Sequence, residues 1–170
     1  MTIVFQPLTN DGLPVLYDWL SRPHVVESWG APPTLTEVAE HYSPDALGKS
    51  GVQAYIAFAN GTPIGYIQSY VAMGSGDGWW EDERDPGVRG IDQFLADAEL
   101  LGQGFGTAMV RDFVAMLFAD PAVTRVQTDP APGNQRAIRC YEKAGFRAVN
   151  EVDTPDGRAL LMLCERAEAT

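Results

Sequence analysis

Three glycines alternate with other residues in the segment Leu101-Gly-Gln-Gly-Phe-Gly106, directly before an apolar stretch with helical periodicity. The N–H groups at the start of a helix have no partner within the helix, and they lie at the positive end of its dipole. Glycines let such a turn approach a phosphate without clashes from Cβ atoms. The segment therefore predicts a helix over residues 104–118 that begins at a phosphate-binding turn, although similar turns also serve packing alone. Neither a Gly-Lys-Ser/Thr sequence nor an opening βαβ repeat accompanies it, which argues against the common nucleotide-binding loops.

A second segment, Asn134-Gln-Arg-Ala-Ile-Arg-Cys-Tyr141-Glu-Lys-Ala-Gly-Phe146, predicts a helix over residues 134–144 that ends at Gly145. It places Asn134 and Tyr141 two turns apart on one face. A phenol near a leaving group can supply a proton to it. A tyrosine at this position can equally be packed against a sheet, and the segment alone does not separate these roles.

The remaining patterns predict an α/β (α+β) protein with one mixed, mostly antiparallel sheet flanked by helices, and a single domain over residues 1–170. Asn10 or Asp11 is expected to cap a helix through Leu20, and Thr34 with Glu37 forms a capping-box pattern. Asn60-Gly61 predicts a hairpin. The expected strands cover residues 3–8, 52–59, 64–71, 91–98, 124–128, 146–152 and 158–164.

Residues 73–90 separate two expected strands and are rich in Gly, Asp and Glu, with Trp79-Trp80 among them. Loops of this length are uncommon in compact domains and tend to be functional. We interpret Trp80 as a pocket residue, whereas adjacent aromatic residues can also simply anchor a loop. The run Glu81-Asp-Glu83 is interpreted as a solvated acidic rim.

The 170 residues contain no apolar run of the roughly 20 residues that would span a bilayer, and the N-terminus lacks a signal pattern. We therefore expect a cytoplasmic protein without a membrane partner. Cys140 and Cys164 lack the spacing of a metal site, so we expect two buried, reduced thiols and no metal.

The formal net charge of −11 makes nucleic acid a poor partner and favours a cationic one, although acidity can also serve solubility alone. The acidic residues are concentrated between Asp77 and Glu99, a stretch that includes most of the long loop. Eight of them stand there against two arginines: Asp77, Glu81, Asp82, Glu83, Asp85, Asp92, Asp97 and Glu99.

Together the two segments resemble the acetyl-CoA site of the GNAT superfamily of N-acetyltransferases. The usual turn pattern is Gln/Arg-x-x-Gly-x-Gly/Ala, and this chain departs from it with Leu101 at the first position. The resemblance implies a GNAT fold, acetyl-CoA as cosubstrate, a pyrophosphate held by backbone amides and a pantetheine arm paired with residues 91–95. The cofactor-binding residues it implies are Gln93, Phe94, Gln103, Gly104, Phe105, Gly106, Thr107, Asn134 and Tyr141.

Within that superfamily the chain resembles the aminoglycoside 6'-N-acetyltransferases over nearly its whole length. The most specific blocks are Gly74-Ser-Gly-Asp-Gly-Trp-Trp80, Asp85-Pro-Gly-Val-Arg-Gly-Ile-Asp-Gln93, Gln127-Thr-Asp-Pro130, Arg136 to Phe146 and Thr154-Pro-Asp-Gly157. An aminoglycoside carries several ammonium groups, and its site needs carboxylates and flat surfaces for sugar rings. The substrate-binding residues implied are Trp29, Tyr42, Gln68, Ser75, Asp77, Trp80, Asp92, Asp129 and Asp156. Judged singly, each of these aspartates is an ordinary turn, cap or surface residue.

The resemblance makes Asp92 the candidate base for the attacking 6'-amine, directly or through a water, and Tyr141 the candidate acid for the departing thiolate. Cys140 is not expected to be a nucleophile. The implied function is acetylation of aminoglycoside antibiotics, which confers resistance. The alternatives are a GNAT enzyme that acetylates polyamines or protein amines, and a protein that binds aminoglycoside or acyl-CoA without turnover. We expect a monomer or a weak homodimer.

Overall fold

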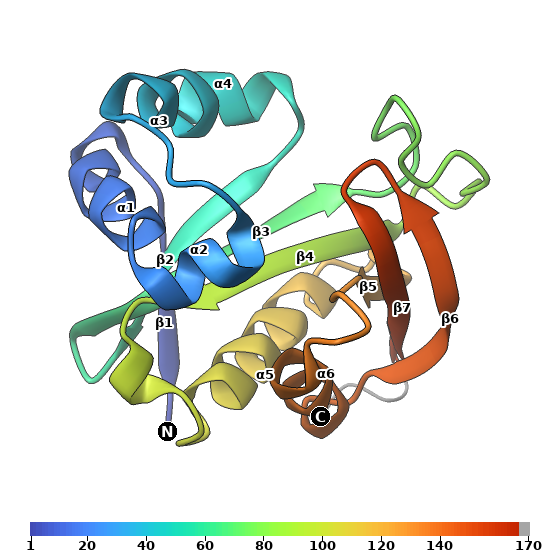
Figure 1. The fold of residues 1–170 in the computed structure, drawn as a ribbon. Helices are drawn as coiled ribbons and strands as arrows, with labels where there is room; N and C mark the ends of the chain where they lie inside the picture. The colour runs from blue at the N-terminus through green and yellow to red at the C-terminus, as the bar shows by residue number, and fades with distance from the viewer. Residues whose placement is uncertain (167–170) are drawn as a thin grey trace. The chain divides into compact units, whose positions relative to one another are not determined.

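The computed structural model describes residues 1–166, and its seven strands form one mixed sheet (Figure 1). The strands are β1 (Ile3–Pro7), β2 (Gln53–Ala59), β3 (Thr62–Val71), β4 (Val88–Leu95), β5 (Arg125–Thr128), β6 (Arg147–Thr154) and β7 (Gly157–Glu165). The helices are α1 (Leu13–Leu20), α2 (Pro23–Trp29), α3 (Leu35–Tyr42), α4 (Pro44–Lys49), α5 (Phe105–Phe118) and α6 (Gln135–Lys143), with 3₁₀ turns η1 (Asn10–Gly12) and η2 (Ala98–Leu100).

The strand order is β1-β2-β3-β4-β5-β7-β6. A two-residue turn joins β2 to β3, and Asn60 (φ 50°) and Gly61 (φ 78°) both have the positive φ of a type I′ hairpin. Strand β4 runs parallel to β5, whereas the pairs β1–β2, β5–β7 and β6–β7 are antiparallel. The predicted mixed, mostly antiparallel sheet is therefore confirmed.

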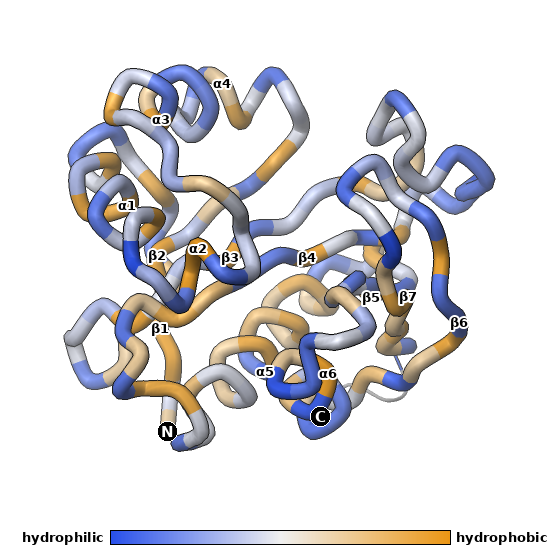
Figure 2. The backbone as a smooth tube through the Cα atoms, viewed as in Figure 1, coloured by the Kyte–Doolittle hydropathy of each residue, from blue (hydrophilic) through white to orange (hydrophobic). Residues whose placement is uncertain are grey.

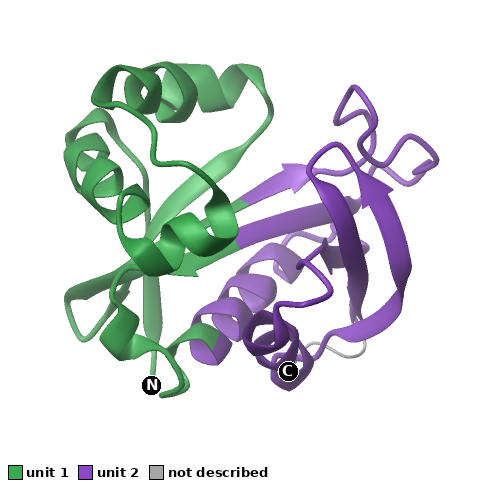
Figure 3. Ribbon diagram, in the orientation of Figure 1, with its two compact units in different colours: residues 1–68, 93–106 green, residues 69–92, 107–170 purple. Residues whose placement is uncertain are grey.

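The chain divides into two compact units (Figure 3), and of the three boundaries between them two fall inside strands and the third falls in the first turn of α5. Unit 1 consists of residues 1–68 and 93–106, and unit 2 of residues 69–92 and 107–170. Each unit therefore holds part of β3 and part of β4. Backbone hydrogen bonds from Ala96 N to Ile64 O (2.8 Å) and from Ala72 N to Val88 O (3.1 Å) give these two strands an antiparallel register.

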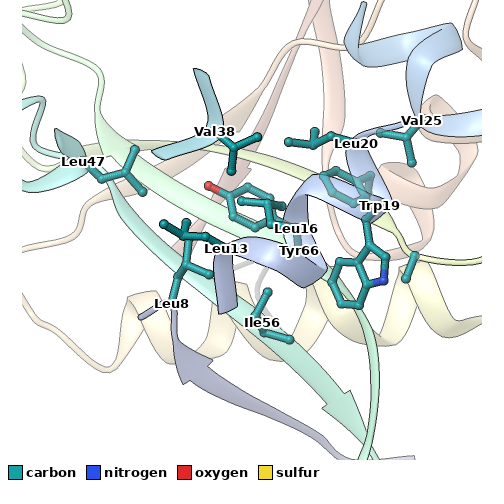
Figure 4. Close-up of a cluster of buried hydrophobic side chains, with 12 residues drawn as sticks. Leu8, Leu13, Leu16, Trp19, Leu20, Val25, Val38, Leu47, Ile56 and Tyr66 are labelled. Carbon is teal, nitrogen blue, oxygen red and sulfur yellow. The ribbon is translucent and has the colours of Figure 1, made fainter. Parts of the chain in front are cut away.

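The core of unit 1 forms where helices α1 to α4 turn their apolar faces toward β2, β3 and β4 (Figure 4). Leu16 and Val38 are fully buried, and Tyr66 from β3 lies among them with its ring completely covered. The predicted Thr34–Glu37 capping box is present at the start of α3, because each residue accepts a hydrogen bond from the backbone N–H of the other.

The core of unit 2 includes the apolar stripe predicted for α5, whose members Val110, Phe113, Val114, Leu117 and Phe118 are all buried. The segment between β3 and β4 contrasts with this stripe, because it is mostly hydrophilic along its length (Figure 2). It forms turns and bends without regular helix or strand.

Three predictions about local structure were wrong. The first helix begins at Leu13 without a side-chain cap, because residues 10–12 form a separate 3₁₀ turn. Helices α2 and α4 were missed, and in each a proline occupies the first turn, where its missing N–H costs nothing. Strand β4 covers residues 88–95 rather than 91–98, because the hydrogen bond from Ala72 N already holds Val88 in the sheet and the chain turns into η2 from Ala98.

Both cysteines are free thiols, with Cys164 buried and Cys140 only half-buried. Within residues 1–166, every helix is too short or too polar to cross a membrane. The same part of the chain has no group of three or more His, Cys, Asp and Glu side chains that could hold a metal ion.

Candidate active site

The glycine-rich turn leads from η2 into α5. Gly102 and Gly104 have φ angles of 75° and 88°, a backbone region that favours glycine, and no heavy atom beyond their chain neighbours lies within 4 Å of a Cβ built on either. Gly106 differs, because it lies inside the first turn of α5. The first N–H groups of this 14-residue helix, from Phe105 onward, are those that a helix leaves without internal partners. The turn thus has the open surface and the donors that a pyrophosphate requires.

Strand β4 continues beyond its ladder with β5. The paired register joins Val88, Arg89 and Gly90 to residues 125–127, whereas β4 extends to Leu95. At the next position, Ile91, a side chain of β5 makes the contact, since Thr128 Oγ1 donates a hydrogen bond to Ile91 O at 3.4 Å. Residues 91–95, predicted to meet the pantetheine arm, thus lie past the end of the β4–β5 pairing.

Helix α6 carries Asn134 and Tyr141. Asn134 is its N-cap and accepts a hydrogen bond from Ala137 N at 3.2 Å, a role that the sequence analysis did not foresee. Tyr141 is 5% exposed and its ring meets Phe146 edge-on, with 5.5 Å between the centroids. Thr107 Oγ1 contacts Cys140 Sγ at 3.8 Å, and burial raises the pKa of this thiol. Cys140 therefore stays protonated at neutral pH, as expected of a cysteine that is not a nucleophile.

Three aspartates from distant parts of the chain lie near one another in unit 2. Burial first, and then the negative charges of Asp92 and Asp156, raise the pKa of Asp129 to about 7. Asp92 lies on β4, Asp129 follows β5, and Asp156 stands in the turn between β6 and β7. Carboxylates gathered in this way repel one another and favour the binding of a cation.

The loop between β3 and β4 meets the β6–β7 turn next to Asp156. A Cβ built on Gly78 would lie 3.1 Å from Pro155 Cγ, so these two segments touch. Asp77, which precedes Gly78, is exposed. The hydroxyl of Ser75 is directed at the backbone, within hydrogen-bond distance of Val71 O (2.9 Å) and Ala72 O (2.8 Å).

The acidic run in this loop is only in part the solvated rim that the sequence suggested, because Glu81 and Asp82 are exposed but Glu83 is not. Glu83 forms a 3.1 Å ion pair with Arg125, and its side chain is only 17% exposed. Asp85 accepts hydrogen bonds from Thr124 Oγ1 (2.7 Å) and Gly87 N (2.8 Å), which lower its pKa. These residues tie the loop to the start of β5, so part of the acidity is structural.

Two of the three predicted aromatic residues of the acceptor site, Trp29 and Tyr42, belong to an aromatic cluster in unit 1, whereas Trp80 lies in unit 2. Trp29 meets Tyr66 and Phe94 edge-on at 5.9 and 5.0 Å, and Tyr42 meets Tyr66 at 6.0 Å. Gln68 belongs to the same group, because its Oε1 accepts from the hydroxyl of Tyr66 at 2.5 Å. A pocket in this unit is lined by Leu20, Trp29, Gly30, Ala31, Pro33, His41 and Tyr42.

Sequence reasoning missed two sets of residues. The first is Tyr70, which lies close enough to Asp92 and Asp129 for their charges to add to burial in raising its pKa. The available signal was its position two residues after Gln68, because residues two apart on a strand lie on the same face of the sheet. Arg22 donates to Ala96 O at 2.8 Å and pairs with Asp97, and His24 Nε2 lies 2.7 Å from Leu95 O. The second set holds the end of β4, and no sequence motif marks it.

Comparison with known proteins places these features in a family. The acetyltransferase (GNAT) domain matches residues 9–154, a span that includes most of both units. Over 168 residues the chain is 57% identical to aminoglycoside N(6')-acetyltransferase type 1 of Klebsiella pneumoniae, which covers 97% of this chain and 84% of that protein. It is also 62% identical over 88 residues to a kanamycin resistance protein of Rhizobium radiobacter, which covers 52% of this chain and 82% of that protein.

Among solved structures, AAC(6')-Ib in complex with coenzyme A and kanamycin superposes with a TM-score of 0.96 at 57% identity. The alignment covers 98% of this chain and 96% of that one. Both the family match and this near-complete correspondence extend through the glycine-rich turn, β4 and α6. The chain therefore belongs to the GNAT family of acetyltransferases.

Proposed function

We propose that this protein transfers the acetyl group of acetyl-CoA to the 6'-amine of aminoglycoside antibiotics and thereby confers resistance to them. The observation that carries the proposal is the gathering of Asp92, Asp129 and Asp156, in which burial first and then the two neighbouring charges raise the pKa of Asp129 to about 7. Such a group of carboxylates is costly without a cation, and an aminoglycoside brings several.

The donor side is supported by the turn before α5. The open glycines Gly102 and Gly104 and the first N–H groups of the helix suit a pyrophosphate. We assign the pyrophosphate to the amides of residues 103–107, and the pantetheine arm to residues 93–94 and to Asn134. The relative crystallised with coenzyme A and kanamycin supports a coenzyme of this type.

The acceptor side is supported by the relatives' names as well as by the carboxylates. The protein from Klebsiella is an aminoglycoside N(6')-acetyltransferase, and the one from Rhizobium is a kanamycin resistance protein. We assign the ammonium groups to Asp77, Asp129 and Asp156, with Ser75 nearby. We assign the sugar rings to Trp29, Tyr42, Gln68 and Trp80.

Asp92 takes a proton from the 6'-ammonium, directly or through a water, because only the neutral amine can attack the thioester. The amine nitrogen forms the new bond to the acetyl carbon as the bond from that carbon to sulfur breaks. Tyr141 gives its proton to the departing sulfur, and the second proton that the nitrogen loses on becoming an amide restores the phenol of Tyr141. The products are the 6'-N-acetyl aminoglycoside and coenzyme A. No covalent enzyme intermediate is required, which agrees with the raised pKa of Cys140.

The test is the release of free thiol from acetyl-CoA with kanamycin, tobramycin and gentamicin, beside spermine and a lysine peptide. We expect turnover with aminoglycosides alone, and a product acetylated at the 6'-amine by mass spectrometry and NMR. Activity confined to spermine or the peptide would keep the acetyl donor but overturn the acceptor. Binding of kanamycin and acetyl-CoA without thiol release would overturn the proposal that the protein is an enzyme.

The acetyl donor is a cytoplasmic metabolite, so we propose that the reaction takes place in the cytoplasm. We further propose that one domain over residues 1–170, as a monomer or a weak homodimer, suffices for activity. Sedimentation of the active protein over a range of concentrations tests the second point.

A further inference from the structure

Tyr70 occupies a space that a glycine opens for it. Its ring lies over Gly90 of β4, where an added Cβ would come within 2.0 Å of Tyr70 Cζ and 2.3 Å of its oxygen. Gly90 has no positive φ, so what requires a glycine here is the tyrosine ring and not the backbone. Any larger residue at position 90 would displace this ring.

The hydroxyl of Tyr70 holds a residue of the long loop. It accepts a hydrogen bond from Trp80 Nε1 at 3.0 Å. Burial, followed by the charges of Asp92 and Asp129, raises the pKa of Tyr70, so the phenol stays neutral at physiological pH. Its oxygen is thus a stable acceptor for the indole N–H.

Trp80 has a backbone that few residues of its kind adopt. Its φ is 48°, in the left-handed region, although it is not a glycine. Such a conformation persists only where the surroundings impose it. The restraints are the hydrogen bond to Tyr70, the hydrogen bond from Glu83 N to Trp80 O (3.0 Å) and the tilted ring of Trp79 at 6.1 Å.

We propose that Tyr70 is a positioning residue for aminoglycoside binding, which acts by fixing the indole ring of Trp80 beside Asp92 and Asp129. This inference rests on the proposed function. It adds the Tyr70 hydroxyl as the group that positions Trp80 in the loop between β3 and β4. Of the restraints on Trp80, the bond to Tyr70 is the one that joins its side chain to β3. Tyr70 therefore influences the acceptor through Trp80.

The decisive variant is Tyr70→Phe, because it keeps the ring over Gly90 and removes only the oxygen. We expect the KM for kanamycin to rise at least about threefold, with the KM for acetyl-CoA and kcat changed less than twofold. Tyr17→Phe is the matched control, since Tyr17 lies in α1 with 38% of its surface exposed. It should change neither constant.

A double-mutant cycle with Trp80→Phe separates positioning from a general loss of stability. If Tyr70 acts through Trp80, adding Tyr70→Phe to Trp80→Phe should raise the KM for kanamycin no further. An equal rise in both backgrounds would overturn the proposal, and so would an unchanged KM in Tyr70→Phe alone.

An NMR measurement tests the anchor without turnover. The protein has four tryptophans, and the indole ¹⁵N–H signal of Trp80 is identified by its loss in Trp80→Phe. We expect this proton to exchange with water at least about tenfold faster in Tyr70→Phe. An unchanged exchange rate would overturn the claim that the Tyr70 hydroxyl holds the indole N–H of Trp80.

The two proposals can fail separately. A wild-type protein that does not acetylate aminoglycosides would overturn the proposed function and the aminoglycoside role of Tyr70 with it. A wild-type protein that does so, together with a Tyr70→Phe variant of unchanged KM, would overturn the role of Tyr70 alone.

Discussion

The aromatic cluster of unit 1 and the carboxylate cluster of unit 2 are built on opposite physical principles. In unit 1, Tyr66 stacks on Phe94 with 5.5 Å between the ring centroids, and both lie in a continuous apolar core. In unit 2, Asp92 and Asp156 stand close enough to Asp129 that their charges add to burial in raising its pKa. The first arrangement stabilises the fold by burying apolar surface, whereas the second places like charges together.

This difference indicates which changes affect folding and which affect activity. Removing a core side chain leaves a cavity and lowers the free energy of unfolding. Removing one of three clustered carboxylates relieves repulsion, so stability is kept or raised while the binding of a cationic substrate suffers. The four predictions below test this division, beginning with the largest effect.

Leu16→Ala should lower the free energy of unfolding by about 2–5 kcal/mol, because Leu16 is fully buried in the core of unit 1. Denaturant titration measures the change. Leu35→Ala is the matched control, since Leu35 is 53% exposed in α3 and should cost less than about 0.5 kcal/mol. Similar losses for the two variants would contradict the placement of the core.

Asp92→Asn should lower turnover at least about tenfold, which corresponds to about 1.4 kcal/mol of transition-state stabilisation. The affinity for acetyl-CoA should be retained, and the free energy of unfolding should not fall, because a like charge near Asp129 is removed. Steady-state kinetics measure the turnover, calorimetric titration with coenzyme A measures the affinity, and denaturant titration measures the free energy of unfolding. Unchanged turnover would remove Asp92 from the role of base.

Tyr141→Phe should slow the transfer several-fold with little change in aminoglycoside affinity, because it removes the proton donor while keeping the ring against Phe146. Single-turnover thiol release and kanamycin titration separate the two quantities. A change in affinity alone would identify Tyr141 as a packing residue, which its 5% exposure also permits.

Asp129→Asn should change how stability depends on pH. The native pKa of about 7 lies above the unfolded value of about 3.9, so the native state binds the proton more tightly. The stability that Asp129 contributes is therefore lost as the pH rises from about 4 through 7. Asparagine does not ionise, so the Tm of the variant should exceed that of the wild type at pH 8 by about 2 °C or more.

The same variant should bind kanamycin less well, and the loss should grow between pH 6 and pH 8 as the wild-type carboxyl ionises. Melting curves and KM values at several pH values provide both measurements. A Tm difference that stays constant across this pH range would show that Asp129 has an ordinary pKa.

Local signals in the sequence were sufficient for much of the fold. The alternation of apolar residues predicted the strands, and the stripe on α5 and the capping box at Thr34 were predicted in place. The two short helices α2 and α4 were not predicted, because six or seven residues are too few to show a helical periodicity of apolar positions. The resemblance carried by the glycine-rich turn and the Asn134–Phe146 segment led to the correct family.

The contacts within the site depend on distant parts of the chain. The sequence by itself determined the residue types, the glycine-rich turn and the strong excess of acidic residues, because these follow from local order and composition. Only the tertiary structure placed Asp156 near Asp129, engaged Glu83 with Arg125, and set Tyr70 over Gly90 beneath the indole N–H of Trp80. Burial and pKa depend on neighbours brought together by folding, and one sequence does not reveal which neighbours those will be.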